Sequence, residues 1–206
     1  SWPSDGVIVN YTQDEADLYW SVDPLQETLK NMIARFGKTK INVVAHSLGT
    51  RGALLALVRI AKAQQTGGQS DKPLINQVVL LAPDIDTGIF KQYLAHIKPL
   101  AKNITIYVSG HDSPLAISAQ VHGYPRLGES GPHLTGLDGV EIIDISDVPV
   151  QYPSGHLYHL YNDSVISDLY QLLNNNKTAA ERDYLKADGE NYWRLLPATD
   201  KRQSPE

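Results

Sequence analysis

The chain contains no cysteine among its 206 residues. This absence excludes a disulfide framework, zinc bound through cysteine, iron–sulfur clusters and a thiol nucleophile. Positive charge is not in excess either, because 18 Lys and Arg stand against 23 Asp and Glu, giving a net charge of −5. A nucleic-acid-binding surface normally carries excess basic charge, so we predict no nucleic-acid partner. Apolar runs are short of the roughly 20 residues that a membrane helix needs, so no membrane span is predicted.

What the chain does have is an ordinary globular composition, with 42% hydrophobic and 20% charged residues. Its length favours one domain, which we place over residues 1–206 with residues 176–206 as a tail docking on the body. We expect the tail to be helical as far as Lys186 and irregular after it. The printed chain starts at Ser1 without a signal-peptide pattern, and the sequence assigns no cellular compartment.

Short apolar segments rich in β-branched residues alternate with segments of helical periodicity. The predicted strands are Lys40–Ala45, Leu74–Ala82, Ile104–Val108 and Val140–Ile145, with Val7–Val9 as a further short strand or a loop. The predicted helices are Leu48–Ala63, Thr87–Leu100, Asp163–Leu173 and one that begins at Asp23-Pro24 and ends at Gly37. Strands without polar alternation are covered on both faces. The pattern therefore predicts an α/β domain, a doubly wound, mainly parallel sheet with helices on both faces.

One long connection, Gly123–Gly139, is rich in glycine and proline and has no clear periodicity. Loops of this length are often functional. The sequence leaves open whether it is a flap over a site or an excursion without a role. Ligands of doubly wound folds bind at the carboxyl edge of the sheet, where this loop starts.

The segment Val43–Gly49 contains the strongest chemical signal. Ser47 lies between a predicted strand and a predicted helix, with the small residues Ala45 and Gly49 two positions before and after it. This spacing resembles the nucleophile elbow of α/β-hydrolases, G-x-S-x-G, with alanine at the first glycine position. A bulky side chain at either flank would clash in the sharp turn, and Gly52 continues the small face of the helix. The alternative is a serine that caps an ordinary helix.

A serine nucleophile needs a general base, and the base needs an acid that orients it. In folds with this elbow the chain order is Ser, then Asp or Glu, then His. Asp112 directly follows the strand predicted over residues 104–108 and is the preferred acid. Asp84 is the runner-up, and Asp86 and Asp147 also lie at strand ends. Asp112 and Asp84 could each instead cap the helix that follows.

Among the seven histidines, His156 follows the last predicted strand by a loop, where the base of such a fold belongs. His159 is the alternative three residues further on. We expect His46 to pack beside the elbow. The remaining histidines lie in a helix, in the long loop or too early in the chain: His96, His111, His122 and His133.

Taken in order, these segments resemble the α/β-hydrolases grouped as the domain of unknown function 900, bacterial proteins often labelled esterase- or lipase-like. The similarity covers nearly the whole chain. The matching stretches are Ser1–Gly6, Val44–Gly49, Leu81–Asp86, Tyr107–Ser109 with Asp112, His122-Gly123, Ile143–Ser146, Gly155-His156 and Tyr192–Leu195.

The resemblance implies an α/β-hydrolase fold in which Ser47 is the nucleophile, Asp112 the acid and His156 the base. It implies that the backbone N–H of Leu48, directly after the nucleophile, is one donor of the oxyanion hole. Asp84 falls in the family's Leu-Ala-Pro-Asp motif, for which we expect a supporting role beside the site.

The sequence departs from the family pattern before Ser1. Such proteins normally carry there a strand ending in a His-Gly-Phe-Asn type of loop, which supplies the second oxyanion donor and pairs with the elbow strand. No segment of this chain matches it. We therefore expect these N-terminal strands to be missing from this chain, and an upstream segment of the same protein to complete the sheet and supply the second donor.

Signals for a metal or an organic cofactor are weak, and none is predicted. His156-x-x-His159 has no acidic partner at useful spacing, and Gly67-Gly68 lacks the Lys-Ser/Thr of a phosphate loop. The leading hypothesis is a serine carboxylesterase that hydrolyses short acyl esters through an acyl-enzyme. The alternatives are a non-catalytic binding domain of the same fold and an acyltransferase with an alcohol acceptor.

Overall fold

The computed structural model of the protein describes residues 11–66, 72–149 and 154–198. It contains a six-stranded sheet with helices on both faces, so the predicted α/β class is confirmed. The expectation of a strand at Val7–Val9 and the Ser1–Gly6 motif lie outside the described residues.

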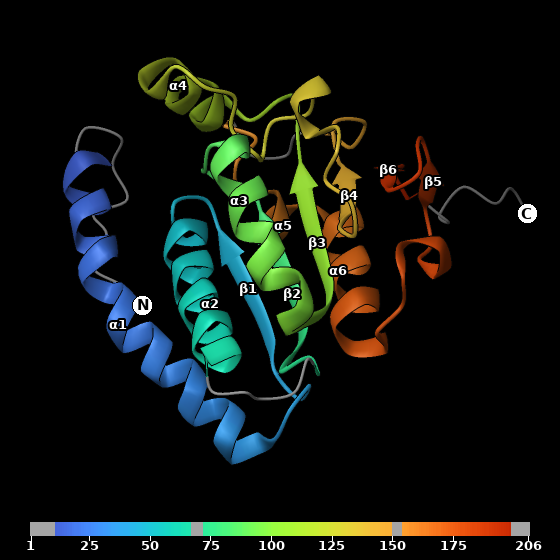
Figure 1. Cartoon of the computed structure of the whole chain (residues 1–206). Helices are drawn as coiled ribbons and strands as arrows, with labels where there is room; N and C mark the ends of the chain where they lie inside the picture. Colours follow the sequence, from blue (N-terminus) through green and yellow to red (C-terminus); the bar gives the residue numbers. More distant parts are fainter. Residues whose placement is uncertain (1–10, 67–71, 150–153, 199–206) are drawn as a thin grey trace, which may run out of the picture.

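The sheet has the strand order β1-β2-β3-β4-β6-β5. The first four strands and β6 are parallel, and β5 runs antiparallel at one edge. The strand bounds are Asn42–His46 for β1, Ile75–Leu81 for β2, Ala101–Val108 for β3, Glu141–Asp144 for β4, Leu185–Ala187 for β5 and Tyr192–Leu195 for β6. The carboxyl ends of the parallel strands meet at one edge, the end toward which the arrows in Figure 1 point and near which α4 lies.

The helices form a layer on each face of this sheet (Figure 1). Their bounds are Tyr11–Phe36 for α1, Gly49–Thr66 for α2, Thr87–Ile97 for α3, Ser113–His122 for α4, Tyr158–Tyr161 for α5 and Asp163–Asn175 for α6. Short 3-10 helices lie at Lys98–Leu100, Pro132–Leu134 and Ala179–Glu181. Within the described residues no helix is both long and apolar enough to cross a membrane.

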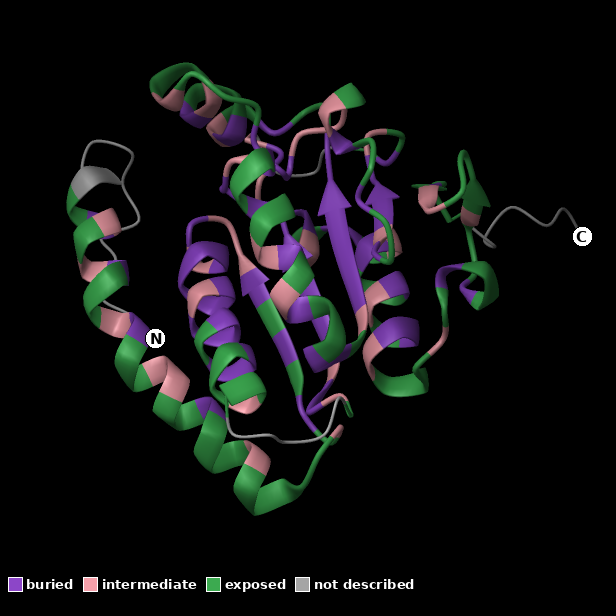
Figure 2. Cartoon of the chain, viewed as in Figure 1, coloured by how far each residue is buried: buried purple, intermediate pink, exposed green. Residues whose placement is uncertain are grey.

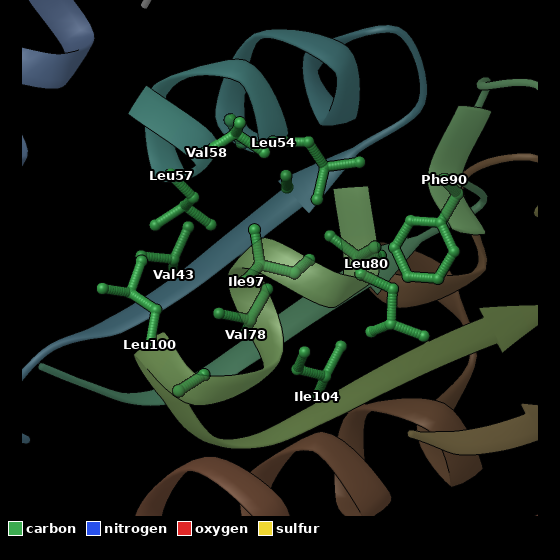
Figure 3. Close-up of a cluster of buried hydrophobic side chains, with 14 of the residues drawn as sticks. Val43, Leu54, Leu57, Val58, Val78, Leu80, Phe90, Ile97, Leu100 and Ile104 are labelled. Carbon is green, nitrogen blue, oxygen red and sulfur yellow. The ribbon is translucent and has the colours of Figure 1, made fainter. Parts of the chain in front are cut away.

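Alternate residues of the central strands face two separate apolar cores, as the period of two in a strand requires. Val78 and Leu80 of β2 pack with α2 and α3 on one face, in the cluster that Figure 3 shows. Val79 and Leu81 face the other way and pack with α6. Both faces are covered, which explains why the strands read as continuous apolar segments.

Helix α1 corrects the prediction that a helix begins at Asp23-Pro24. The helix already includes Tyr11 and continues through Pro24 to Phe36. Proline removes one helical hydrogen bond and usually breaks a helix interior. Here burial holds the helix together on both sides of the proline, because Val22 before it and Leu29 after it are 1% and 6% exposed.

The C-terminal segment corrects the prediction of a helix reaching Lys186. Only a single 3-10 turn forms, at Ala179–Glu181, and the chain then adds β5 and β6 to the sheet. β6 pairs in parallel with β4, placing Trp193 opposite Ile143. Residues 185–195 are therefore part of the sheet.

Arg182 anchors this C-terminal segment in the interior. Its guanidinium, 4% exposed, lies 2.9 Å from a carboxylate oxygen of Asp168 on α6 and 2.9 Å from one of Glu141 on β4. The hydroxyl of Tyr107 on β3 donates to the same Asp168 oxygen at 2.5 Å. Burial raises the pKa of the Asp168 carboxyl, which Arg182 opposes. The network ties three elements to a single cation.

The long Gly123–Gly139 connection is built into the carboxyl edge rather than lying free above it. Gly128 accepts from the N–H of Ser109 at 2.9 Å and donates to the carbonyl of Pro83 at 3.0 Å, so it bridges the ends of β2 and β3. A Cβ on Gly128 would lie 2.7 Å from the carbonyl carbon of Ala82, which explains the glycine. The segment is therefore packed against the ends of β2 and β3 and is not a free excursion. That it covers a site stays an interpretation.

Strand β1 has a described strand partner, β2, on one side only. Its residues alternate between exposed and buried, as the mixed colouring of β1 in Figure 2 shows. Val44 is 46% exposed. β3 is buried through most of its length. That an upstream segment pairs with β1 stays a prediction.

Candidate active site

Ser47 lies in the tight turn between β1 and α2, with a backbone φ of +52°. A positive φ is uncommon for a residue with a side chain and costs on the order of 1–3 kcal/mol. The turn is held by hydrogen bonds, since the Ser47 N–H donates to the carbonyl of Leu81 at 2.9 Å and its own carbonyl accepts from Asp84 at 3.2 Å. The strained strand-to-helix turn that the sequence pattern predicts is therefore present.

The small residues around the turn have separate packing reasons. Ala45 is 8% exposed within the core of the sheet. A Cβ on Gly52 would lie 2.8 Å from Cδ1 of Leu18, so this glycine allows α1 to approach α2. The close packing predicted for the α2 helix thus occurs against α1.

Asp112 and His156 are brought together at the same edge of the sheet. Nδ1 of His156 lies 2.9 Å and 2.8 Å from the two carboxylate oxygens of Asp112. Asp112 is 4% exposed and also caps α4, accepting from the N–H of Leu115 at 3.1 Å. The cap interpretation of Asp112 is therefore confirmed, and the same carboxylate bonds His156. With its Nδ1–H donated to the carboxylate, a neutral His156 carries its free lone pair on Nε2.

The backbone around His156 is fixed from several sides. Gly155 has φ +67°, and a Cβ there would lie 2.3 Å from the carbonyl oxygen of His111. The N–H of Ser113 donates to the carbonyl of Ser154 at 3.1 Å. Because the neighbours of His156 are anchored to the Asp112 segment, the two catalytic candidates move as one unit.

Tyr158 ties this histidine loop to the strand ends. Its hydroxyl accepts from the N–H of Ala82 at 2.5 Å and lies 3.3 Å from the carbonyl of Tyr107, to which it donates. Burial, followed by the nearby charge of Asp112, raises the pKa of this phenol well above its ordinary value. Tyr158 therefore stays neutral, and its hydroxyl links the histidine loop to the backbone of the two strand ends. Sequence reasoning missed it, because a buried tyrosine near a histidine has no distinguishing pattern.

Three imidazoles cluster behind the Ser47 turn. The ring centroid of His46 lies 4.6 Å from that of His156 and 4.5 Å from that of His159. Nε2 of His46 lies 3.1 Å from the carbonyl oxygen of His156, a bond in which the ring N–H donates. Burial, and then the two neighbouring histidines, lower the pKa of His46 to about 3. Burial and His156 likewise lower the pKa of His159.

Asp84 joins four segments below the turn. It is 2% exposed, and its Oδ1 accepts from the hydroxyl of Ser118 on α4 at 2.7 Å. Guanidinium nitrogens of Arg51 on α2 and Arg126 in the long loop each lie 3.5 Å from that same oxygen. Arg51 also donates to the Asp84 carbonyl at 2.6 Å and pairs with Glu15 on α1.

Comparison with known protein families adds to this geometry. The family model described as alpha/beta hydrolase of unknown function (DUF900) matches residues 1–176. The chain belongs to this family. No curated protein and no solved structure matches the chain. The resemblance read from the motifs is thereby confirmed, and the family carries no established substrate or activity to transfer.

The other acid candidates in this hydrolase lie elsewhere. Asp86 caps α3 by accepting from the N–H of Ile89 at 2.9 Å. Asp147 forms a surface ion pair with Arg194, in which its Oδ2 lies 3.4 Å from a guanidinium nitrogen. His159 contacts His46 and not a carboxylate. Among the described residues no cluster of three acidic or histidine side chains could hold a metal ion.

A cavity of about 430 Å³ is bounded by α1, α2, α3 and the end of α4, and its lining residues do not include Ser47, Asp112 or His156. Arg51, in the first turn of α2 after Ser47, forms part of its wall. The apolar and aromatic lining residues are Tyr19, Leu55, Ile85, Ile89, Tyr93 and Tyr124. Pockets of this size and composition are typical of small-molecule sites. The sequence did not reveal this lining, because its members come from four separate elements.

Proposed function

We propose that this α/β-hydrolase is a serine carboxylesterase in which Ser47 is the nucleophile, His156 the general base and Asp112 the orienting acid. The observation that carries the proposal is the bond from Nδ1 of His156 to both oxygens of Asp112, at the edge where Ser47 occupies its strained turn. A serine, a base and a buried acid at one sheet edge form the arrangement that nucleophilic acyl transfer requires.

In the proposed reaction, Oγ of Ser47 attacks the ester carbonyl while Nε2 of His156 takes its proton. The imidazolium then passes this proton to the leaving alcohol, and Asp112 stabilises the positive charge from the Nδ1 side. Water, deprotonated by the same histidine, hydrolyses the acyl-enzyme and frees the serine. The proton from Ser47 leaves with the alcohol, and the proton taken from water restores the Ser47 hydroxyl, so His156 and Ser47 end the turnover as they began it.

The tetrahedral intermediate carries an oxyanion, which needs preorganised N–H donors. The N–H of Leu48 stands at the start of α2, where the first N–H groups of a helix have no partner within the helix. The positive end of the helix dipole adds to their effect. A second donor from an upstream segment of the same protein remains part of this proposal.

The neutral imidazoles beside His156 support its role as base. A cationic neighbour would oppose protonation of His156, because two positive charges a few ångströms apart repel. The lowered pKa values of His46 and His159 keep both rings uncharged at neutral pH. His46 in addition holds the carbonyl of His156 through its ring N–H, which makes it a positioning residue.

The cavity beside Arg51 supports esters of small apolar acids as substrates. Its volume of about 430 Å³ holds a short acyl chain, and its wall is mainly apolar and aromatic. Asp84 then acts as support, because it links Arg51 in the cavity wall to the backbone of the Ser47 turn.

The test is intact-mass spectrometry of the purified protein before and after treatment with a fluorophosphonate. We expect a single covalent adduct on the wild type and none on Ser47→Ala. Ser21→Ala is the matched control, since Ser21 lies within α1 and only donates to the carbonyl of Asp17. Hydrolysis of p-nitrophenyl acetate and butyrate should follow the same pattern.

An unlabelled wild type with intact secondary structure would contradict the esterase proposal and favour a non-catalytic binding domain. Ester hydrolysis that survives Ser47→Ala would rule out Ser47 as nucleophile. Product analysis with added alcohols separates hydrolysis from acyl transfer, because an acyltransferase would form the new ester in preference to the free acid.

A further inference from the structure

A second cavity lies at the opposite edge of the sheet from Ser47. It measures about 700 Å³ and opens at the amino ends of β1, β2 and β3, beside the end of α6. Asn42 and Ser47 stand at the two ends of β1, five residues apart, which corresponds to about 16 Å along a strand. Neither the family nor the proposed esterase activity assigns a role to this edge.

A row of amides forms one wall of this cavity. Asn42 pairs with Gln77, and Gln77 pairs with Asn103, in the registers of neighbouring strands, so the three side chains stand side by side across the sheet. They share the α6 face, since Asn42 Nδ2 donates to the carbonyl of Leu173. Further along β2 the same face is apolar. The polar row is thus confined to the cavity.

The side-chain oxygen of Gln77 is buried and has no hydrogen-bond partner among the described residues. Gln77 is 5% exposed and lines the cavity. Leaving a buried amide oxygen unsatisfied costs free energy, so native structures rarely do so without a reason. A ligand hydroxyl in the cavity would supply the missing donor.

The neighbouring amides are already ordered. Asn76 donates to Oδ1 of Asn42 at 2.9 Å and to Oδ1 of Asn176 at 2.6 Å. Asn103 donates to Glu141 at 3.1 Å. Their remaining hydrogen-bonding capacity is therefore held in a fixed orientation, which lowers the entropic cost of binding a polar ligand.

The cavity is also locally basic in a chain whose net charge is −5. Its lining includes Lys40, Lys102 and Lys177 and no acidic residue. Within the described residues none of the three forms an ion pair with Asp or Glu. Lys177 donates to the neutral Oε1 of Gln171 at 3.0 Å, which fixes its ammonium, and it also interacts electrostatically with Glu181.

We propose that this cavity binds a phosphorylated sugar. Lysine ammonium groups bind phosphate through charge-assisted hydrogen bonds, and side-chain amides donate to and accept from hydroxyl groups. The volume lies in the range of small-ligand pockets and exceeds what an isolated phosphate fills. The site is separate from the triad, and it does not depend on Ser47 being a nucleophile.

The test is isothermal titration calorimetry of the purified protein with glucose 6-phosphate, fructose 6-phosphate, glucose and inorganic phosphate as probes. We expect one or both sugar phosphates to bind with a Kd below about 1 mM. Glucose and inorganic phosphate should each bind at least about tenfold more weakly, because each satisfies only one half of the site.

Variants assign the binding to this cavity. Lys102→Gln should weaken the sugar phosphate about tenfold or more by removing one charge, and Gln77→Leu should weaken it by removing the buried amide. Lys62→Gln, on the exposed part of α2, removes an equal charge outside the cavity and should change Kd less than twofold. Circular dichroism checks that each variant is folded. Because Lys102 is exposed, Lys102→Gln should fold normally even if Gln77→Leu does not, so the test stays decisive.

Failure of both sugar phosphates to bind at 10 mM would overturn the proposal. Binding unchanged in Lys102→Gln would place the ligand elsewhere and overturn it equally. Inorganic phosphate binding as tightly as the sugar phosphates would reduce the site to an anion site and contradict the assigned ligand class. Labelling of Ser47 by a fluorophosphonate is read separately, so each proposal can fail alone.

Discussion

Gly155 and His111 are packed so closely that only a glycine fits between the base and acid segments. A Cβ at residue 155 would lie 2.3 Å from the carbonyl oxygen of His111, and φ at Gly155 is +67°. This contact sets the distance between the loop that carries His156 and the segment that carries Asp112. The spatial relation of the base to the acid is therefore a backbone contact as well as a side-chain bond.

Gly155→Ala should impair both stability and activity. The clash with His111 adds to the strain of a left-handed conformation, so we expect the free energy of unfolding to fall by roughly 2 kcal/mol or more. Ester hydrolysis should fall with it, because His156 is displaced. Gly123→Ala is the control: φ is +76° there and nothing lies within 4 Å of the added Cβ, so only about 1 kcal/mol is expected. Urea denaturation and kcat measure both, and equal effects of the two variants would refute the contact argument.

Asp112→Asn should leave the fold nearly intact and reduce kcat by roughly 10⁴-fold. An amide in place of the carboxylate no longer stabilises the imidazolium and favours the wrong histidine tautomer. Asp147→Asn removes a carboxylate from an exposed pair with Arg194 and should leave kcat within about twofold. Steady-state hydrolysis of p-nitrophenyl acetate is the measurement. A loss below about tenfold in Asp112→Asn would show that Asp112 is not the acid.

His46 should make the protein less stable in acid. Its pKa is about 3 in the folded chain against an ordinary value of 6.5, so between these pH values the unfolded chain binds a proton that the folded chain does not. The free energy of unfolding then falls as the pH falls from about 6.5 toward 3, with a limiting slope of about 1.4 kcal/mol per pH unit.

The variant His46→Gln should flatten this pH dependence. Urea denaturation at pH 7, 6, 5 and 4 compares it with the wild type, and His96→Gln on α3 serves as the control that keeps the three-imidazole cluster. His159, whose pKa is also lowered, contributes equally in all three proteins. Parallel curves for wild type and His46→Gln would show that His46 is not buried in its neutral form.

Ile89→Trp should discriminate between acyl chains. Ile89 lines the cavity beside Arg51 and is 44% exposed, so the larger side chain is tolerated and occupies space meant for the acyl group. We expect kcat/KM for p-nitrophenyl butyrate to fall about tenfold and that for the acetate to change far less. Ile166→Trp, at a 42% exposed position on α6, should alter neither. Equal losses for both esters would place the acyl group outside this cavity.

Arg182→Met should be strongly destabilising. Removing the guanidinium leaves Asp168, 1% exposed, as a buried carboxylate without a cation, at a cost of about 3–5 kcal/mol. Arg194→Met breaks a pair whose side chains are 44% and 47% exposed and should cost at most about 1 kcal/mol. Thermal and urea unfolding compare the two variants. Similar costs would mean that the interior network contributes no more than a surface pair.

Apolar periodicity was sufficient to predict the central strands. The four strands β1 to β4 lie within three residues of their predicted bounds, because each is a continuous apolar segment whose burial follows from both faces being covered. α4 was not predicted, since it begins directly after Asp112 and has almost no amphipathic pattern between Leu115 and His122. A local sequence pattern identifies a helix when one of its faces is buried against the core. Because α4 lies at the edge of the sheet, it leaves no clear pattern of this kind.

Pro24 shows where a local rule fails. Its sequence context, Asp23-Pro24, has the chemistry of a helix start, and the helix nevertheless passes through it. The deciding contribution is the burial of Val22 before the proline and Leu29 after it, which is tertiary and cannot be read from the local sequence. The same applies to β6, whose pairing with β4 depends on a distant segment of the chain.

For the candidate site, the elbow spacing named Ser47, and chain order with the positions of the predicted strands favoured Asp112 over Asp84 and His156 over His159. The structure brings Asp112 and His156 into contact and leaves their catalytic role as a prediction. Tyr158 and Asp84 could not be given their bonding roles from sequence. Their partners come from strands and loops that approach only in the folded chain.

The position of β6 has a consequence for how the protein is made. β6 lies between β4 and β5, yet its residues, Tyr192–Leu195, leave the ribosome some fifty residues after Asp144 at the end of β4. Until then the outer edge of β4 has no strand to pair with. The carboxylate of Asp168 likewise lacks its ion pair until Arg182 has been synthesised. A ribosome-bound chain therefore passes through a stage with an open sheet edge, and conditions that slow translation between β4 and β6 would prolong exposure to aggregation.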